Sequence, residues 1–267
     1  MMKSTSVSTL AAALALAALS LTGCTKDDVV TSSTGPVTIN LDHMVGTDPL
    51  ILNTNSYQNA LGQDFTVSSF KYYLSNIVFN KADGNHVALP NTYFLVDAAN
   101  VASRDVALPE VPVGDYTSMT LTLGVDSARI KAGNFSGALD PNNNMFWNMN
   151  GPEFKNLLLE GYSTFAPHAT GATTGGLVYH IAGYQHASTN TIRTFTVPFP
   201  AGVSLLVRPD HSPEIHTLVD VAQLFRSPNQ ISFADRASYN VMGGVVAARI
   251  ADNAASGMFT VGHIHAD

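Results

Sequence analysis

The spacing of apolar residues after position 36 constrains the fold more than any other feature of this sequence. From Val37 onward they recur at every second position or form short β-branched and aromatic blocks, separated by Gly, Asn, Asp and Pro. A period of two places successive side chains on opposite faces of a strand. We therefore predict one all-β domain over residues 37–267, a β-sandwich of mainly antiparallel strands with long loops and one or two short helices. The expected strands are residues 37–41, 65–79, 93–96, 116–123, 157–162, 177–182, 191–198 and 203–207.

Two stretches depart from this alternation, and one long loop stands out. Residues 218–225 and 234–250 have apolar residues at mixed spacings of three and four, which favours short helices. Residues 126–150 are polar and contain Pro141, yet they also carry a Met-Phe-Trp run that ends at Trp147. Long loops in compact domains are commonly functional. We therefore expect this loop to contribute to a functional site.

The first 23 residues have the layout of a lipoprotein signal peptide. Lys3 precedes an Ala- and Leu-rich run over residues 10–21, which is too short to cross the roughly 30 Å hydrocarbon core of a bilayer. Leu21-Thr22-Gly23-Cys24 is similar to a lipobox, in which the cysteine thiol accepts a diacylglycerol. We expect cleavage before Cys24 and lipidation of its thiol. The lipid would then anchor the protein to a membrane.

Polar residues follow the cysteine, and residues 24–36 are expected to form a lipidated flexible tether. The order Lys26-Asp27-Asp28 is similar to the export signal of some surface lipoproteins. These features predict an outer membrane lipoprotein exposed either to the periplasm or at the cell surface.

Charge and cysteine content exclude several classes of function. The formal net charge is −7, so the chain lacks the basic balance that nucleic acid phosphates require, and we expect no nucleic acid partner. Cys24 is the chain's single cysteine. Once it is lipidated, no thiolate metal site and no disulfide within the chain can form. A metal site would have to use imidazole, thioether or other nitrogen donors, which suits copper, with zinc a weaker alternative.

Nine histidines are many for a chain in which only 12% of the residues are charged. Imidazole is the commonest protein metal ligand. His43 follows the first expected strand and His180 lies within another, while His263 and His265 stand two apart, so a strand would place both on one face. We take these four as candidate metal ligands. The other histidines are expected to have ordinary surface or core roles: His86, His168, His186, His211 and His216.

Catalytic motifs are not found in the sequence. It contains no nucleophile elbow, phosphate loop, zinc-protease helix or dinucleotide fingerprint. We therefore expect a binding protein rather than an enzyme.

Met145 and Met149, which flank Trp147, are the methionine pair considered as thioether donors. Several acidic residues are expected to cap turns or to hydrogen-bond neighbours: Asp97, Asp126, Asp140, Glu160 and Asp220.

Several phrases, taken together and in order, resemble the MbnP-like family, the methanobactin-associated periplasmic proteins and related copper-responsive surface proteins of methane oxidisers. Trp147 lies in the most telling group of these phrases. The matching segments are residues 65–77, 93–97, 111–116, 123–126, 137–141, 145–148, 159–161 and 179–180.

The resemblance implies a β-sandwich that binds copper outside the cytoplasm through imidazoles and, in some members, through a tryptophan oxidised to kynurenine. Carried over by motif, His180 and His43 would be ligands, Trp147 would be the modified residue, and His263 or His265 would complete the set. The family's modification is linked to a dihaem enzyme of the cytochrome c peroxidase type, which would be a partner here. This chain departs from the family where Asn148-Met149-Asn150-Gly151-Pro152 replaces a second tryptophan and a Gly-Tyr pair.

Three interpretations follow. The first is a copper-binding lipoprotein that captures, stores or transfers copper. The second is a metal-free surface module that binds a partner protein or a glycan through its loops. The third is an enzyme in which copper with an open coordination position activates oxygen.

Overall fold

The structure is a computed structural model of the whole chain, and it describes residues 33–148, 151–167 and 176–266. These residues belong to one compact unit, Ser32–Asp267. The predicted signal peptide, Cys24, most of the tether, Met149 and His168 lie outside the described residues. None of the described helices is both long enough and apolar enough to cross a membrane.

Strands dominate the described chain. They are β1 (Thr34–Val45), β2 (Asp48–Pro49), β3 (Tyr57–Gln58), β4 (Asp64–Asn80), β5 (His86–Asp97), β6 (Asp105–Pro112), β7 (Gly114–Tyr116), β8 (Ser118–Leu123), β9 (Phe146–Trp147), β10 (Glu153–Tyr162), β11 (Gly176–Ala182), β12 (Arg193–Pro198), β13 (Leu205–Val207), β14 (Glu214–Asp220), β15 (Asn240–Met242) and β16 (Phe259–His265). The α-helices are α1 (Ser127–Ala132) and α2 (Gly244–Gly257). Short 3-10 helices are η1 (Val101–Arg104), η2 (Gly137–Leu139), η3 (Pro141–Asn143), η4 (Ala187–Thr189) and η5 (Val221–Phe225).

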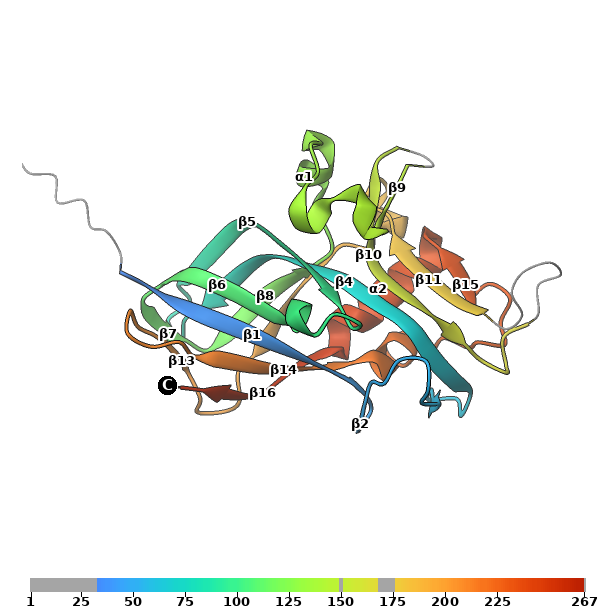
Figure 1. Cartoon of the computed structure of the whole chain (residues 1–267), viewed down its shortest axis with the longest axis horizontal. Helices are drawn as coiled ribbons and strands as arrows, with labels where there is room; N and C mark the ends of the chain where they lie inside the picture. Colours follow the sequence, from blue (N-terminus) through green and yellow to red (C-terminus); the bar gives the residue numbers. More distant parts are fainter. Residues whose placement is uncertain (1–32, 149–150, 168–175, 267) are drawn as a thin grey trace, which may run out of the picture. The chain divides into compact units, whose positions relative to one another are not determined.

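Two sheets form a sandwich, as the sequence predicts (Figure 1). The small sheet has five strands in the order β16-β14-β1-β2, with β6 also paired to β1. The large sheet has nine strands, built on the order β12-β8-β4-β10-β11-β15, with β3, β5 and β9 added at its sides. Apolar side chains of both sheets meet in one core, among them Ile39 and Leu41 of β1 and Phe70 and Tyr72 of β4. The pairs β1–β14 and β11–β15 are parallel, and the other pairs are antiparallel.

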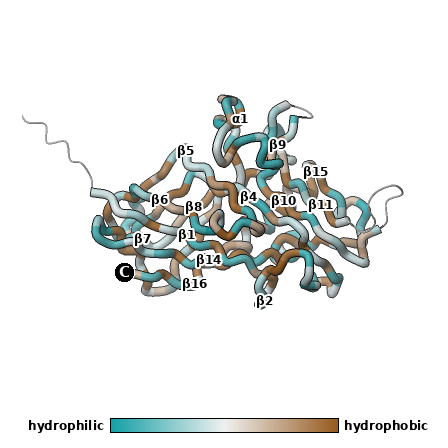
Figure 2. Tube along the Cα trace, viewed as in Figure 1, coloured by the Kyte–Doolittle hydropathy of each residue, from teal (hydrophilic) through white to brown (hydrophobic). Residues whose placement is uncertain are grey.

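Strand β4 keeps one row of apolar side chains in the core between the sheets along its whole length by changing register twice. Residues of this core stand at odd positions up to Val67, at even positions from Phe70 and again at odd positions from Ile77. Register shifts at Ser68 and at Asn76 accompany these changes. A one-residue shift in register moves every later side chain to the other face, so a bulge is the local means of correcting the pattern. Figure 2 shows apolar and polar residues alternating along the strands.

A second, smaller apolar cluster lies on the outer face of the large sheet. Tyr73 and Leu158 project from β4 and β10, away from the core between the sheets. Residues from the loop that the sequence singled out cover them, including Ile130 of α1, Leu139 and Met145. The loop is therefore a folded cap on the sheet, and Figure 1 shows it as a separate layer above β10.

Both helix predictions are only partly confirmed. Residues 218–225 form the end of β14 followed by the short 3-10 helix η5, and residues 234–250 contain β15 and the first half of α2. Positive φ angles at Gly243 and Gly244 mark the true start of α2. A strand that ends in a tight turn mixes spacings of two and three, and this mixture resembles a helical pattern. The elements that were not predicted are strands β2, β3, β6, β9, β14 and β15 and helix α1, and β1 begins three residues earlier than expected.

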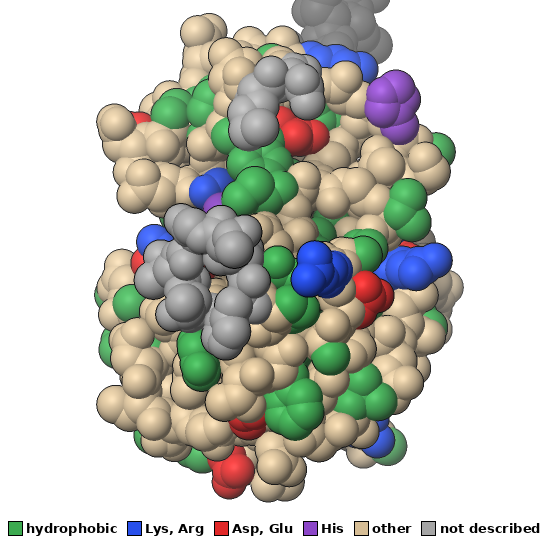
Figure 3. All heavy atoms as spheres, turned by 90° about the vertical axis from the view of Figure 1, so that its right-hand side faces the viewer, with side chains coloured by type: hydrophobic (Ala, Val, Ile, Leu, Met, Phe, Trp, Pro, Cys, Tyr) green, Lys and Arg blue, Asp and Glu red, His purple; other side chains and the backbone are tan. Residues whose placement is uncertain are grey.

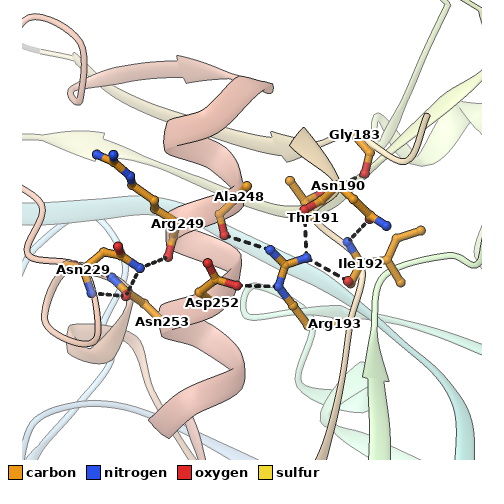
Figure 4. A network of polar contacts seen from close by, with 10 residues as sticks. All are labelled: Gly183, Asn190, Thr191, Ile192, Arg193, Asn229, Ala248, Arg249, Asp252 and Asn253. Carbon is orange, nitrogen blue, oxygen red and sulfur yellow. Dashed lines mark hydrogen bonds and ion pairs between the residues drawn. The ribbon is translucent and has the colours of Figure 1, made fainter. Parts of the chain in front are cut away.

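Polar side chains fasten α2 to the loops around it (Figure 4). The amide of Asn253, fully buried, donates to the carbonyl oxygens of Leu224 (2.9 Å) and Asn229 (2.6 Å), and its oxygen accepts from the Asn229 N–H (2.7 Å). At the adjacent residue of α2, Asp252 pairs with Arg193 of β12 at 2.6 Å near the surface. The first contact satisfies buried backbone groups, whereas the second is an ion pair within reach of water.

We predict that Asn253→Ala destabilises the protein far more than Asp252→Ala. Removing the Asn253 amide leaves three backbone groups unpaired, two of them carbonyls that it bonds in the interior, at a cost of about 1–3 kcal/mol for each buried group. Removing a surface ion pair costs about 0–1 kcal/mol. Urea unfolding of the two variants measures both values, and equal destabilisation would contradict the assignment.

Candidate metal centre

Three motif residues hold the cap in place from the neighbouring strands. The Asp126 carboxylate caps α1 by accepting from the Arg129 N–H at 2.9 Å. It also accepts from the Tyr93 hydroxyl of β5 at 2.5 Å and from the Asn76 amide of β4 at 3.1 Å. Burial, with the bond to Asp126, raises the pKa of Tyr93 to about 12, so the phenol keeps its proton. This network fixes the start of the segment that leads to Trp147, and it confirms the capping role predicted for Asp126.

Trp147 lies at the far end of the cap, where β9 pairs with the first residues of β10. Its indole N–H donates to a carboxylate oxygen of Glu153 at 2.7 Å. The ammonium of Lys155 lies 5.9 Å from the centre of its ring. Trp147 is only half-buried, in contrast to Met145, which is fully buried in the cap cluster and has a packing role.

His180 projects from β11 on this same outer face. Its neighbour Tyr179 is in the inter-sheet core, so the alternation along the strand directs His180 outward. The His180 ring lies 5.9 Å from the Trp147 ring, measured between centroids. Its Nε2 is 2.8 Å from the Glu160 carboxylate, which leaves Nδ1 available to a ligand. A carboxylate on one ring nitrogen is the usual device that orients a metal-binding imidazole.

The backbone next to Glu160 is held at a close approach between β10 and β4. A Cβ added to Gly161 would lie 1.9 Å from the Thr66 carbonyl oxygen. Only glycine is therefore accommodated at this position, and a register shift between the strands occurs there. Bulges next to functional sites commonly redirect a side chain. The Leu159-Glu160-Gly161 segment thus has a structural explanation: Gly161 permits the close approach of the two strands, and Glu160 lies beside His180.

A pocket of about 330 Å³ adjoins this group of side chains. Glu153, His186 and Met242 contribute to its lining. Met242 of β15 is the register partner of His180, so the two side chains share a face, and Met242 is 57% exposed. The pocket therefore adds a thioether, an exposed imidazole and a carboxylate beside Trp147 and His180.

Charges around the group alternate in sign. Desolvation lowers the pKa of Lys155 below its ordinary value, and the negative charge of Glu160 acts to raise it. Lys71, opposite Leu158 on β4, pairs with Asp97 at 2.9 Å. Among the described atoms on the face drawn in Figure 3, lysine and arginine side chains stand apart and form no basic patch.

The donors present are suited to copper. His180 supplies an imidazole held by a carboxylate, Met242 a thioether, and Glu153 an oxygen. Unmodified Trp147 supplies no ligand atom, because an intact indole nitrogen is a hydrogen donor only. Opening of the indole ring would convert that nitrogen into an aromatic amine with a lone pair. It would lie beside Glu153, in the group that contains His180.

His43 lies elsewhere, in the core between the sheets. It is 6% exposed, and its Nε2 is 3.0 Å from the Tyr72 hydroxyl. Its ring makes edge contacts with Phe70 and Tyr72. Burial lowers the pKa of His43 to about 4, helped by the positive charge of Arg104 and opposed by Asp97. His43 is thus a neutral core imidazole, on the opposite face of the large sheet from His180.

His263 and His265 do come together on one face of β16, as predicted. They are joined by His216 of β14, which the sequence had placed among the ordinary histidines. One possible ligand atom from each of the three lies within 4.8 Å of the others. Ile215, the neighbour of His216, is fully buried between the sheets, so the trio lies on the outer face of the small sheet. It is therefore separate from Trp147 and His180.

Sequence reasoning missed Glu153, Met242 and His216. Glu153 and Met242 depend on the register of β9 with β10 and of β11 with β15, which no local pattern reports. His216 could have been found from the Glu-x-His alternation that begins β14, had the segment after it not been predicted as a helix.

Comparison with known proteins identifies one family. The model of the MbnP family matches residues 34–243, more than half of the chain. A solved structure, MbnP from Methylosinus trichosporium, is similar with a TM-score of 0.48 and 13% identity, covering 79% of this chain and 83% of that one. No curated protein matches the sequence.

We predict that His43 makes stability depend on pH in a defined direction. The pKa of His43 is about 4 in the folded protein, below its ordinary value of 6.5. Between these two pH values the imidazole is protonated in the unfolded chain but stays neutral in the folded protein. Stability from this group is fully present above pH 6.5 and declines as the pH falls to 4, by about 3 kcal/mol at most. The measurement is urea unfolding across this range for the wild type and His43→Gln. An identical pH slope in both would contradict the assignment.

Proposed function

The chain belongs to the MbnP family, and we propose that it is a copper-binding lipoprotein that captures, stores or transfers copper outside the cytoplasm. The observation that supports this most directly is the meeting of Trp147 and His180 on the outer face of the large sheet. A residue of the cap and a residue of β11, far apart in sequence, contact each other there. Their carboxylate partners are already in place.

Under this proposal His180 is the principal ligand through its free Nδ1, with Glu160 orienting the ring. Met242, across the β11–β15 register, and Glu153 are the further donors on that face. The site would hold copper for capture, storage or transfer. Because its residues are only half-buried, a partner could reach the bound copper. The proposed role is binding, and it includes no catalytic step.

Trp147 is proposed to complete the ligand set after oxidation to kynurenine. One dioxygen molecule would add across the indole C2–C3 bond, which breaks, and water would then hydrolyse the resulting N-formyl group, releasing formate and leaving the aromatic amine. A partner, a dihaem enzyme of the cytochrome c peroxidase type, would drive this oxidation. Half-burial leaves the indole accessible to such a partner. Glu153 favours removal of an electron because its carboxylate can take the indole proton across the 2.7 Å hydrogen bond. The Lys155 ammonium opposes it at longer range, 5.9 Å from the ring centre.

The lipid on Cys24 is proposed to place this centre at the outer membrane, facing either the periplasm or the exterior. The predicted tether joins the cysteine to β1. A short flexible link keeps the domain near the bilayer without fixing its orientation. Copper capture close to the membrane is the use that such a placement favours.

We predict that His180→Ala weakens copper binding by tenfold or more, because replacing even an outer partner of a metal ligand costs about 10–100-fold. Glu160→Gln should weaken it within that range. His86→Ala is the matched control, since His86 is exposed at the start of β5 and outside the site. Copper titration of protein exported from the full chain gives the affinities. Unchanged binding in His180→Ala would contradict the proposal and favour a metal-free module that binds a protein or glycan.

A separate prediction concerns the modification. In protein isolated from its native host, peptide mapping should find oxidised Trp147, and Glu153→Gln should lower the oxidised fraction because the amide cannot accept the indole proton. Glu160→Gln should leave that fraction unchanged, since Glu160 pairs with His180 and not with Trp147. Equal oxidation in the wild type and Glu153→Gln would show that Glu153 has no such role.

A further inference from the structure

We propose a second metal site, formed by His216, His263 and His265 on the outer face of the small sheet. Its occupant is a divalent first-row ion that prefers nitrogen donors, with copper(II) bound most tightly and zinc(II) less so. The site does not rest on the copper function proposed above. It shares no residue with the Trp147 and His180 group, and it lies on the other sheet.

The geometry of the three imidazoles supports this site. The Nε2 atoms of His263 and His265 are 2.9 Å apart. The His216 ring stacks on His263, with centroids 4.5 Å apart and planes 8° from parallel, and it meets His265 edge-on at 4.9 Å. Two ring nitrogens at 2.9 Å cannot both present lone pairs to each other. Either a shared proton or a cation between them removes the repulsion.

The spacing is close to what a metal requires. Bonds of about 2.0–2.1 Å from zinc to imidazole nitrogen imply nitrogens about 3.3 Å apart in a tetrahedral site. The possible ligand atoms of the three histidines all lie within 4.8 Å of one another, so modest side-chain rotations bring them to that spacing. Three protein ligands would leave a position for water, because His263 and His265 are exposed.

Two carboxylates flank the trio. The Asp42 carboxylate of β1 lies 3.9 Å from Nδ1 of His216, and the Glu214 carboxylate lies 3.5 Å from its Nε2. Acidic groups near a cation site favour the cation electrostatically, and carboxylates beside ligating imidazoles orient them. The donor set is nitrogen-rich and has no thiolate. Affinity for such a set rises along the first-row series to copper(II) and falls again at zinc(II).

Strand pairing builds the site. His216 and His263 are register partners across β14 and β16, and a register shift follows beside Gly262. A bound ion would therefore join β14 to β16, the outermost strand of the small sheet's main path. His263 and His265 lie beyond residue 243, where the match to the family model ends. The family match covers His216 but neither of the other two histidines.

The test uses a background variant, Trp147→Phe with His180→Ala, which removes the residues of the other proposed centre. Titration of this full-chain protein with copper(II) should find one equivalent bound, and the electron paramagnetic resonance of that copper should report imidazole nitrogens. Adding His216→Ala, His263→Ala or His265→Ala should each weaken binding about tenfold or more. Saturating zinc(II) should raise the unfolding temperature of the background and not that of the triple alanine variant.

His86→Ala, another exposed histidine on a strand, is the matched control and should leave the titration unchanged. Equal unfolding temperatures without metal would show that the alanine variants remain folded, as expected for side chains on an outer face. The proposal is overturned if the background binds no copper, or if the triple alanine variant binds as well as the background. If the single variant His180→Ala binds less copper than the wild type, that result concerns the Trp147 and His180 centre and not the histidine trio.

Discussion

Burial of β4 on both of its faces is the constraint on which the rest of this structure depends. Phe70, Tyr72 and Leu74 point into the core between the sheets, while Tyr73 points the other way into the cap cluster. A strand that is apolar on one face only would leave the outer face of the large sheet to water. The outward Tyr73 requires a cover, and the segment from α1 to β9 supplies it. The cap brings Trp147 to the sheet surface, and β11 places His180 beside it.

Much of the architecture could be predicted from the sequence because period-two alternation is strong in the buried strands. The expected strand at residues 65–79 corresponds to nearly all of β4, because aromatic and β-branched residues resume on both sides of the bulges at Ser68 and Asn76. The helix predicted at residues 218–225 is only partly confirmed, because Leu218 belongs to β14 while Leu224 and Phe225 belong to the 3-10 helix η5 and pack in the core. Local spacing cannot distinguish that arrangement from one short helix.

The site was only partly predictable, for a different reason. His180 and Trp147 could be proposed as partners only through the family resemblance, since nothing in their spacing relates β9 to β11. The family phrases also proved to include structural anchors: Asn76, Tyr93 and Asp126 hold the cap, and Gly161 permits a close approach of two backbones. His43 shares the residue type of a ligand but occupies the core, where its lowered pKa reflects desolvation. Type and motif therefore identify candidates, whereas burial and register assign their roles.

The two proposed centres differ in what must happen before each can bind a metal. At the first, His180 and its carboxylate are positioned by folding, but the indole nitrogen of Trp147 is held as a hydrogen donor to Glu153 and cannot ligate until the ring is opened. At the second, pairing of β14 with β16 brings three imidazoles together without any change to a side chain. Under these proposals the first centre depends on a partner enzyme, and the second depends on folding alone. One sandwich can thus hold a centre that requires maturation and another that does not, because its two sheets present separate outer faces.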